Sequence, residues 1–497
     1  MKPGERTQVV VVGAGPVGLM LAGELRLGGA DVVVLETLTE PTTESRASTL
    51  HARTMEIFDS RGLLTALGTP PRDAMGHFGG IKMDLTLPGP YPGQWKVLQA
   101  AAAVVLEEWA RSLGADIRRG YAVDGLVVTG DDVVVEAYGP RGPLTVTAEY
   151  VVGCDGEEST VRRLTGAAFP GRDAGRELLR GDVAGIAVPD RRFERLPRGL
   201  AVAARRPDGV TRVMVHESGG TPVPRTGEPA FEELAKAWHR VTGEDISGGE
   251  PLWVNAFDDT TRQVARYRDG RLLFAGDAAH RQMPIGGQAL NLGLQDAVNL
   301  GWKLATVVAG RQSAELLDSY HDERHAVGAQ TLADISAQAE LLFGGPGIEP
   351  LRSVFGRLIA QPAVRAELAG TISGTGLRYE FGDSLPPSVG RRLPPELLGG
   401  SAVAALLRGG KGLLILLGDR ELLAATASNW ADRVEVAVFP EIATLPHALL
   451  VRPDGYVAWV PDCPTPLDSA LRRWFGPPAD PQTVKEGDPW RLASMSE

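Results

Sequence analysis

A glycine-rich loop near the N-terminus has the residue types and spacing to bind a dinucleotide. It follows the apolar run at 8–12 and precedes a helical stretch, and Glu36 ends the next apolar run at 31–36. Such a loop presents backbone N–H groups and a positive helix end to a pyrophosphate. A carboxylate in the position of Glu36 accepts hydrogen bonds from ribose and repels a 2′-phosphate, which favours FAD or NAD over NADP. A glycine loop alone is also compatible with a plain turn. The loop residues are Gly13, Gly15, Pro16 and Gly18.

A second candidate site follows the apolar run 271–275, which ends in Gly276 and Asp277. An acid at the carboxyl end of a core strand lies where α/β sheets bind ligands. The alternative is that Asp277 only caps the next segment. The bare backbone further along the chain suits close approach of a planar ring. That segment contains Pro284, Gly286, Gly287, Leu290 and Asn291.

A third motif is the apolar pair Val151-Val152 followed by Gly153-Cys154-Asp155-Gly156, with Arg162 shortly after it. Read alone, it is equally a strand that ends in a turn and a helix cap.

These motifs require strands and helices to position them. Continuous aliphatic runs without alternation predict strands of a parallel sheet covered on both faces. We expect a strand–helix–strand unit over 8–36, helical spacing at 45–68, irregular strands at 73–98, and a Pro-rich linker near 384–400 that precedes a small third α/β domain. Further helices are expected at 99–113, 230–242, 288–310 and 313–345, and further strands at 117–119, 125–129, 133–138, 145–152, 413–417, 434–438 and 448–452.

Taken together and in this order, the three motifs resemble those of the class A FAD-dependent aromatic monooxygenases typified by para-hydroxybenzoate hydroxylase. The similarity covers residues 1 to about 380, and the tail at 452–459, Arg-Pro-Asp-Gly-Tyr-Val-Ala-Trp, resembles the thioredoxin-like C-terminal domain of longer members. The overall sequence most resembles actinobacterial hydroxylases of aromatic polyketide antibiotic biosynthesis, especially those acting on angucyclinones. The sequence departs from the family's usual pattern at Ala289-Leu290 and at the alanine run 100–103.

The resemblance implies an α/β fold class: a Rossmann-like FAD-binding domain interleaved with a mixed β-sheet substrate domain, plus a thioredoxin-like α/β domain. We place the FAD-binding domain at 1–73, 99–178 and 268–383, the middle substrate-binding domain at 74–98 and 179–267, and the C-terminal domain at 384–497. It also implies FAD as cofactor, NADPH or NADH as co-substrate, and O2, with ring hydroxylation through a flavin C4a-hydroperoxide.

The resemblance further implies roles for single residues. The glycine loop would hold the FAD pyrophosphate and Glu36 the adenosine ribose. Arg46 and Gln99 would lie beside the flavin and its ribityl chain, which Asp277 would bind. Asp155 and Arg162 would belong to a motif shared by FAD and NAD(P)H binding. The flavin ring would be lined by Pro284 and the backbone from Gly286 to Asn291.

The middle segment offers a candidate substrate wall. Strand alternation puts Trp253, Asn255 and Phe257 on one face, which suits a flat polycyclic phenol, although core packing explains the same pattern. We see no arginine cluster there that is dedicated to a benzoate carboxylate. His216 is a candidate base for a phenol, with a structural role as the alternative; no catalytic residue is assigned firmly, and no metal-spaced cluster appears.

Composition limits the other function classes. The 497-residue chain is 43% hydrophobic and carries a formal net charge of −11, so no global field attracts nucleic acid or an anionic membrane. Its two cysteines, Cys154 and Cys463, cannot build a disulfide framework or a cysteine zinc cluster. No apolar stretch is long enough to span a bilayer. We expect a cytoplasmic monomer or homodimer whose partner is a small aromatic polyketide.

Two other functions stay open at this point. A Baeyer–Villiger oxygenase or an oxidase is compatible with the same scaffold, and so is a flavin-binding redox sensor without turnover. Product masses separate the first two from a hydroxylase, and the sensor predicts no NAD(P)H oxidation stimulated by an aromatic ligand.

Overall fold

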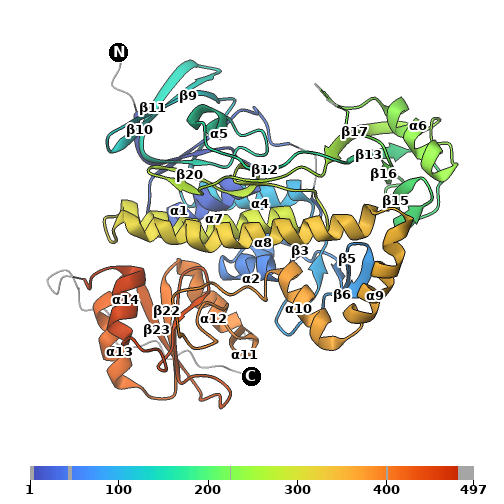
Figure 1. Ribbon diagram of the computed structural model, residues 1–497. Coiled ribbons are helices and arrows are strands. Elements are labelled where there is room, and N and C mark those ends of the chain that lie inside the picture. The colour runs from blue at the N-terminus through green and yellow to red at the C-terminus, as the bar shows by residue number, and fades with distance from the viewer. Residues whose placement is uncertain (1–4, 43–46, 224, 226, 399–400, 480–497) are drawn as a thin grey trace.

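The structure is a computed structural model, and it describes all residues except 1–4, 43–46, 224, 226, 399–400 and 480–497. The structure has three main sheets, and the chain returns to the first of them after it has formed the second. The long helix α8 (Asp318–Phe343) runs across the middle of the molecule between them (Figure 1). The α/β fold class predicted from the sequence is confirmed. The predicted domain boundaries stay a prediction.

The first sheet has eight strands in the order β19-β20-β11-β1-β2-β8, with β10 and β9 extending it from β11. The pairs β20/β11, β11/β1, β1/β2 and β2/β8 are parallel. Residues 9–12 and 32–35 are buried, as expected for valine-rich strands covered on both faces. The strands are β1 (Glu5–Val12), β2 (Val32–Glu36), β8 (Asp116–Arg119), β9 (Ala122–Thr129), β10 (Asp132–Gly139), β11 (Gly142–Gly153), β19 (Arg268–Asp269) and β20 (Leu272–Phe274).

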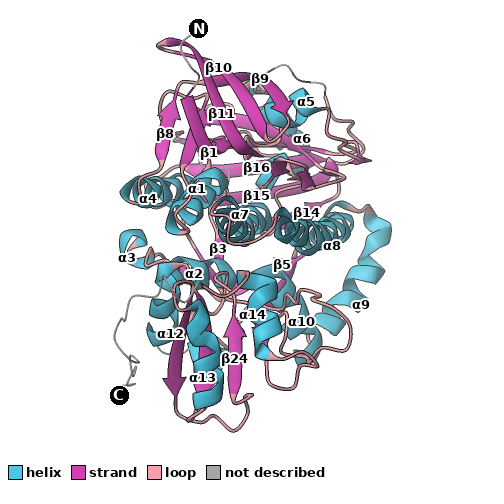
Figure 2. Cartoon of the chain, turned by 90° about the vertical axis from the view of Figure 1, so that its left-hand side faces the viewer, coloured by secondary structure: helices cyan, strands magenta, loops and turns pink. Residues whose placement is uncertain are grey.

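Helices cover this sheet and join it to the rest of the molecule. Helix α1 packs against α4 and α7, and Figure 2 shows these three helices below the sheet, end-on beside α8. Helix α7 is buried over most of its length because it lies between α1, α2 and α8. The helices are α1 (Pro16–Leu27), α2 (Ala52–Ser60), α3 (Leu64–Leu67), α4 (Gln99–Ser112), α5 (Thr160–Thr165) and α7 (Gln288–Val308).

The second sheet is antiparallel, in the order β14-β15-β16-β13-β17. One face packs on α6 (Phe231–Thr242) through a cluster that includes Leu179, Val213 and Trp238. The other face turns toward α8 and the segment after β20. The strands are β13 (Glu177–Ala184), β14 (Arg191–Leu196), β15 (Gly199–Arg205), β16 (Thr211–Glu217) and β17 (Glu250–Asp258).

Short strands and two further helices complete this half of the molecule. The hairpin β5/β6 packs against α8, α9 and α10 through the cluster around Phe78 and Leu341, and lies beside these helices in Figure 1. The remaining elements are β3 (Leu50–His51), β4 (Arg72–Asp73), β5 (Met75–Phe78), β6 (Ile81–Asp84), β7 (Gln94–Trp95), β12 (Gly171–Arg172), β18 (Thr261–Gln263), β21 (His280–Arg281), α9 (Glu349–Ile359) and α10 (Pro362–Ser373).

The third sheet has the order β23-β22-β24-β25, with β22/β23 parallel and the other pairs antiparallel. The predicted linker at 384–400 is packed where the structure describes it: Leu393 N–H donates to Gly455 O, and Gly390 N–H to Val457 O. These elements are α11 (Pro395–Leu398), α12 (Ser401–Leu406), β22 (Gly412–Leu417), α13 (Glu421–Ala427), β23 (Val434–Phe439), β24 (Ala448–Val451), β25 (Val457–Trp459) and α14 (Leu467–Phe475).

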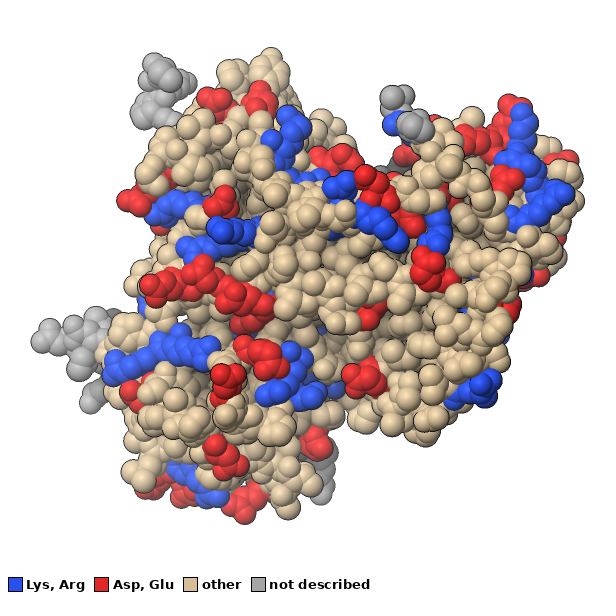
Figure 3. Space-filling view, viewed as in Figure 1, with Lys and Arg blue, Asp and Glu red and all other residues tan. Residues whose placement is uncertain are grey.

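Within the described residues, no helix is both long enough and apolar enough to cross a membrane. Acidic and basic side chains are interspersed over the face shown in Figure 3. This mixed pattern agrees with the absence of a dominant basic field from the composition.

Candidate functional site

The sequence motifs meet at one edge of the first sheet. Leu35 of β2, Val12 of β1, Gly153 of β11 and Phe274 of β20 pair in a single row across four parallel strands. Each motif begins directly after this row, so the glycine loop, Glu36, the Cys-Asp-Gly turn and the Gly-Asp turn share the carboxyl edge. Ligands of open α/β sheets bind at this edge.

Of the three glycines in the loop, Gly15 is the one at which internal packing among the described residues does not require a glycine. A Cβ on Gly13 would stand 2.5 Å from Cys154 O, and a Cβ on Gly18 would stand 2.0 Å from Gly13 O, so both serve internal packing. A Cβ on Gly15 would meet no atom of the described residues within 4 Å. Gly15 is also the N-cap of α1 and has no side-chain cap. Open space before a free helix N-terminus fits the pyrophosphate of a dinucleotide.

Glu36 has two backbone partners at this edge. Its Oε2 accepts from Ala14 N–H at 2.6 Å and its Oε1 from Leu38 N–H at 2.8 Å. The carboxylate therefore fixes the glycine loop to the end of β2. Each carboxylate oxygen keeps a further lone pair that is able to accept a hydrogen bond from a hydroxyl group.

Asp277 lies in a 3-10 turn, η1 (Gly276–Ala278), and is exposed although residues 272–276 and 278–280 around it are buried. This turn is held from behind by Asp296 of α7, which the sequence analysis did not single out. Asp296 Oδ2 accepts from Gly276 N–H at 3.2 Å and from His280 Nε2 at 2.8 Å. Its Oδ1 accepts from Arg324 Nε at 2.6 Å.

Asp296 is completely buried, and this burial acts to raise the pKa of its carboxyl. The charge of Arg324 and the hydrogen bond from His280 outweigh burial and hold the pKa below its usual value. The carboxylate is therefore ionised, and it fixes the Gly-Asp turn with one charged group. Only the packing of α7 on α8 and η1 brings these side chains together.

Asp155 and Arg162 have structural partners. Asp155 Oδ1 accepts from Ser159 Oγ at 2.5 Å and Oδ2 from Val161 N–H at 3.0 Å, so Asp155 holds the start of α5. Arg162 Nη1 donates to Ala278 O at 3.0 Å, beside Asp277, and its Nη2 donates to Glu157 O. The Cys-Asp-Gly segment is thus connected to the Gly-Asp turn through Arg162. The role of Asp155 and Arg162 in cofactor binding stays a prediction.

The segment from Pro284 to Asn291 consists of a turn, 284–287, and the first residues of α7. Pro284 is exposed and Gly286 and Gly287 are half-buried, with φ angles of 66° and 69° that favour glycine. Asn291 fixes the turn: its Nδ2 donates to Gly287 O at 2.7 Å, and its Oδ1 accepts from His51 N–H at 2.9 Å. Leu290 is 9% exposed and belongs to the core of the first sheet.

His51 lies behind the same turn. Its Nε2 is 2.8 Å from Gly286 O, and burial lowers the pKa of the imidazole to about 4. The ring is therefore neutral at pH 7, and donation from Nε2 to the carbonyl leaves Nδ1 as an acceptor. No hydrogen-bond partner is found for Nδ1 in the part of the chain that the structure describes.

Arg46 and Gln99 were predicted to lie beside the flavin, and the structure describes one of the two. Gln99 begins α4, and its Oε1 accepts from Ala47 N–H at 3.2 Å. It thus lies beside the segment that leads to Arg46. Arg46 itself lies outside the described residues.

The predicted aromatic face exists on β17. Asn255 pairs with Arg180 of β13, and the guanidinium of Arg180 lies 5.3 Å from the ring centroid of Trp253 and 5.2 Å from that of Phe257. The aromatic face of β17 is therefore more basic than its own sequence indicates, because the pairing of β17 with β13 places Arg180 beside Trp253 and Phe257. Phe257 also packs with Met283 and Ile285, which lie next to Pro284.

His216 lies on the same face of this sheet, two residues along β16 from Met214. Its Nδ1 is 2.9 Å from Glu177 O, its ring contacts Phe343 edge-on, and burial lowers its pKa. The histidine is neutral and packed. Its role as a base stays a prediction.

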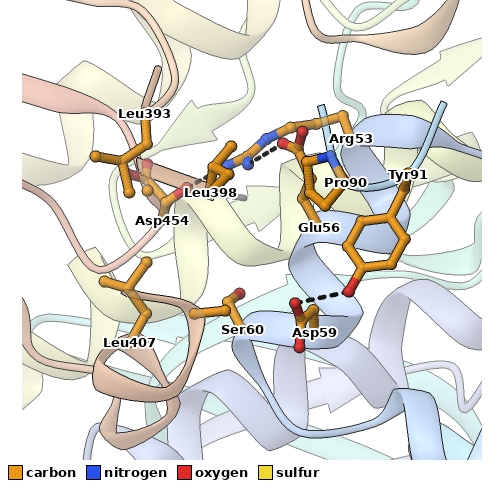
Figure 4. A pocket seen from close by; sticks show the side chains of 12 residues that line it. Arg53, Glu56, Asp59, Ser60, Pro90, Tyr91, Leu393, Leu398, Leu407 and Asp454 are labelled. Atoms are coloured by element: carbon orange, nitrogen blue, oxygen red, sulfur yellow. Dashed lines mark hydrogen bonds and ion pairs between the residues drawn. The ribbon is translucent and has the colours of Figure 1, made fainter. Parts of the chain in front are cut away.

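A small cavity of about 20 Å³ lies elsewhere, between α2 and the C-terminal segment (Figure 4). Arg53 and Glu56 point into it, and Tyr91 Oη donates to Asp59 Oδ2 at 2.7 Å. It has room for about one water molecule, so it is not a cofactor site.

Comparison with known proteins agrees with this geometry. The sequence profile of a family described as "FAD binding domain" matches residues 6–334, and that of "Aromatic-ring hydroxylase, C-terminal" matches residues 386–478. The chain belongs to the FAD-dependent aromatic hydroxylase family. This confirms the predicted family, FAD as the cofactor, and a flavin monooxygenase that consumes O2 and NAD(P)H.

Three relatives of this hydroxylase span nearly its whole length. The 12-dehydrotetracycline 5-monooxygenase/anhydrotetracycline 6-monooxygenase of Streptomyces rimosus is 39% identical, over 95% of this chain and 100% of the relative. The crystal structure of CabE, an aromatic hydroxylase from angucycline biosynthesis, is 46% identical, with a TM-score of 0.90 over 95% of this chain and 99% of CabE. A dialkyldecalin synthase of Streptomyces rugosporus is 38% identical, over 95% of this chain and 99% of the relative.

Proposed function

We propose that this hydroxylase acts on a polycyclic aromatic polyketide of the angucyclinone type, with NADPH or NADH as the reductant. One observation carries the proposal: Met283 and Ile285, on either side of the exposed Pro284, pack in one cluster with aliphatic residues and Phe257 of the second sheet. The similarity to an angucycline hydroxylase and to tetracycline monooxygenases supports the same class.

We also propose how the chain holds FAD. The open space at Gly15 and the N-terminus of α1 receive the pyrophosphate, Glu36 receives the adenosine ribose, and the exposed Asp277 receives the ribityl hydroxyls. When bound, FAD supplies the transfer of reducing equivalents from nicotinamide to O2 and of one oxygen atom to the aromatic ring. The remaining proposed cofactor residues are Gly13, Pro16, Gly18, Arg46, Gln99, Asp155, Arg162, Pro284, Gly286, Gly287, Leu290 and Asn291.

The residues at the turn supply electrostatics and rigidity. Helix α7 begins at Gln288 behind Gly287, and this N-cap glycine has no side chain with which to cap the helix N-terminus. Its free N–H groups and positive end stabilise negative charge at the turn. Asn291 and the neutral His51 hold the turn in place through the backbone of Gly287 and Gly286.

The wall excludes water and orients the ring system. Leu178, Leu200, Met214 and Phe257 of the second sheet pack with Ile335 and Leu342 of α8 beside the turn. Aromatic faces at Trp253 and Phe257 hold a flat substrate by stacking and apolar burial, at about 25 cal/mol per Å² removed from water. A single ring buries too little area to be held well.

The test is turnover under 18O2 with NADPH and four compounds: para-hydroxybenzoate, phenol, a naphthoquinone and a tetracyclic angucyclinone. We expect one labelled oxygen in an aromatic product and the highest ratio of product to NADPH with the tetracycle. The highest ratio with a single-ring phenol would contradict the substrate class and leave the monooxygenase intact. Label in a ring-opened acid or lactone would instead establish Baeyer–Villiger chemistry.

Two substitutions test the cofactor residues. Asp277→Ala should weaken FAD retention, since a hydrogen bond to a charged group contributes about 1.5–3 kcal/mol. Glu36→Ala should lower FAD affinity without changing the position of hydroxylation, because it lies at the far end of the edge from the turn. Unchanged FAD affinity of Asp277→Ala would show that the Gly-Asp turn is misassigned. A changed product of Glu36→Ala would show that the dinucleotide motif is misassigned.

A further inference from the structure

Two glutamine side chains from different helices lie at Gly286. Gln288 starts α7 and is 5% exposed, and Gln338 of α8 is completely buried. The point where a Cβ on Gly286 would stand is 3.5 Å from Nε2 of Gln288 and 3.9 Å from Oε1 of Gln338. The two amides therefore approach the same glycine, Gln288 with its nitrogen and Gln338 with its oxygen, at the turn proposed to line the flavin.

The amide nitrogens of both side chains have no hydrogen-bond partner among the described residues. The orientation of Gln338 is determined by the hairpin, because its Oε1 accepts from Gly79 N–H at 3.4 Å. Its NH2 group is therefore the end that lacks a partner. A buried polar group left unpaired costs about 1–3 kcal/mol. Two buried amide groups that both approach Gly286, each with an unpaired NH2 group, are therefore evidence for a ligand that supplies acceptors.

The surroundings determine which acceptor fits. Met283, Ile285, Ile335 and Ala339 form an apolar cluster on one side, and Phe78 and Leu341 belong to an apolar cluster on the other. His51, the titratable group bound to Gly286 O, is neutral at pH 7. Uncharged donors in apolar surroundings pair with a carbonyl oxygen at a smaller desolvation cost than with a carboxylate.

We propose that Gln288 and Gln338 form a donor pair for a ketone or quinone carbonyl of the polycyclic substrate. The pair determines which edge of the ring system faces Gly286 and thus where the oxygen enters. A site built to donate to an oxygen rejects an analogue without that oxygen, because its own donors then stay unpaired. The inference rests on the proposed function, since it takes a polycyclic substrate to lie at this turn.

The test measures binding to the oxidised holoenzyme without NADPH, through the change in flavin absorbance. The ligands are a tetracyclic quinone and its analogue in which the quinone carbonyls are replaced by methylenes. Gln338→Met and Gln288→Met keep the side-chain length and remove the donors. Gln330→Met is the matched control, because Gln330 is an exposed glutamine of the same helix that donates to Asp334 Oδ1 at 3.0 Å.

We expect each of the two variants to bind the quinone at least tenfold more weakly and to lose the preference for quinone over analogue. Their FAD content and flavin spectrum without ligand should match the control. If Gln338→Met does not fold because Gly79 N–H loses its acceptor, Gln288→Met alone decides. The inference is overturned if the variants keep the wild-type preference for the quinone over its methylene analogue. It is also overturned if they lose FAD and keep that preference, because the two amides would then bind the cofactor. If the wild-type holoenzyme bound neither tetracycle, the proposed substrate class itself would fail, and the inference with it.

Discussion

Arg452 and Glu323 form a buried bidentate ion pair between the C-terminal segment and α8. Arg452 Nη1 and Nη2 donate to the two carboxylate oxygens of Glu323 at 2.7 and 2.8 Å. Neither residue is more than 6% exposed. The turn that carries Arg452 also reaches α2, because Asp454 O accepts from Arg53 Nη2 at 2.5 Å. Thr54, next to Arg53, donates to Asn291 Oδ1 at 2.7 Å, and Asn291 in turn holds Gly287 O, so the C-terminal segment supports a helix that contacts the turn at Gly286 and Gly287.

We predict that Arg452→Met destabilises the protein by about 3–5 kcal/mol. The substitution removes the cation that Glu323 and Asp454 share. Glu323 keeps its pair with Lys303 at 3.1 Å, but one of the two buried negative charges becomes uncompensated, which is expensive. The free energy of unfolding from urea denaturation checks this.

Arg472→Met is the matched control for that substitution. Arg472 pairs with Asp468 at 2.8 Å on the exposed side of α14, with about half of each side chain accessible. Surface pairs of this kind contribute about 0–1 kcal/mol. If Arg452→Met and Arg472→Met lowered the free energy of unfolding equally, the buried pair would not stabilise the contact between the C-terminal segment and α8.

The stability contributed by Glu323 should depend on pH in the acid range. Burial acts to raise the pKa of this carboxyl, but Arg452 and Lys303 outweigh burial and lower it from 4.5 to about 2. A lowered folded-state pKa contributes stability that is complete above pH 4.5 and is lost as the pH falls toward 2. The difference in unfolding free energy between wild type and Glu323→Gln should therefore be constant from pH 7 to 5 and shrink below pH 4.5. A difference that grows on acidification would contradict the assignment.

Gly15→Ala should separate cofactor binding from folding. Its Cβ meets no atom within 4 Å in the part of the chain that the structure describes, and the φ of −72° suits alanine, so the thermal stability of the FAD-free protein should be unchanged. FAD affinity should fall about tenfold or more, because the methyl group obstructs the approach of the pyrophosphate to the helix N-terminus. Fluorescence titration of the FAD-free protein measures this.

Gly18→Ala provides the contrast for Gly15→Ala. Its Cβ would stand 2.0 Å from Gly13 O, so the loop must shift, and the FAD-free protein should already melt at a lower temperature. If Gly15→Ala lowered the melting temperature as much as Gly18→Ala, the space at Gly15 would not be a ligand space.

Cys463→Ser should retain hydroxylation, because the C-terminal domain has no Cys-x-x-Cys pair for thiol exchange. Burial raises the pKa of the Cys463 thiol, and Val460 N–H lies 3.5 Å from its sulfur. Modification of native protein by a thiol reagent at pH 8 should accordingly be slower than that of a free cysteine. A folded Cys463→Ser protein without activity would show that the thiol takes part in turnover.

Most of the fold follows from local sequence pattern. The predicted helices at 99–113, 230–242, 288–310 and 313–345 correspond to α4, α6, α7 and to η2 (Ala314–Leu317) with α8. Helical spacing at 45–68 becomes the shorter α2 and α3, because Gly62, at φ 73°, separates them. Helices α9 and α10 were not predicted, although Pro350 and Pro362 in their first turns are a recognised N-terminal signal.

The amino-acid sequence by itself determined the cofactor edge, because each motif is local: a buried strand, then a glycine or an acid within a few residues. It could not determine which distant side chains complete that edge. Asp296 reaches the Gly-Asp turn, Arg180 reaches the aromatic wall and Gln338 reaches Gly286 only through helix packing and strand pairing. Local periodicity places a residue on a face of its own element. Which element that face meets depends on how the three sheets pack around α7 and α8, and this was decided by the tertiary structure alone.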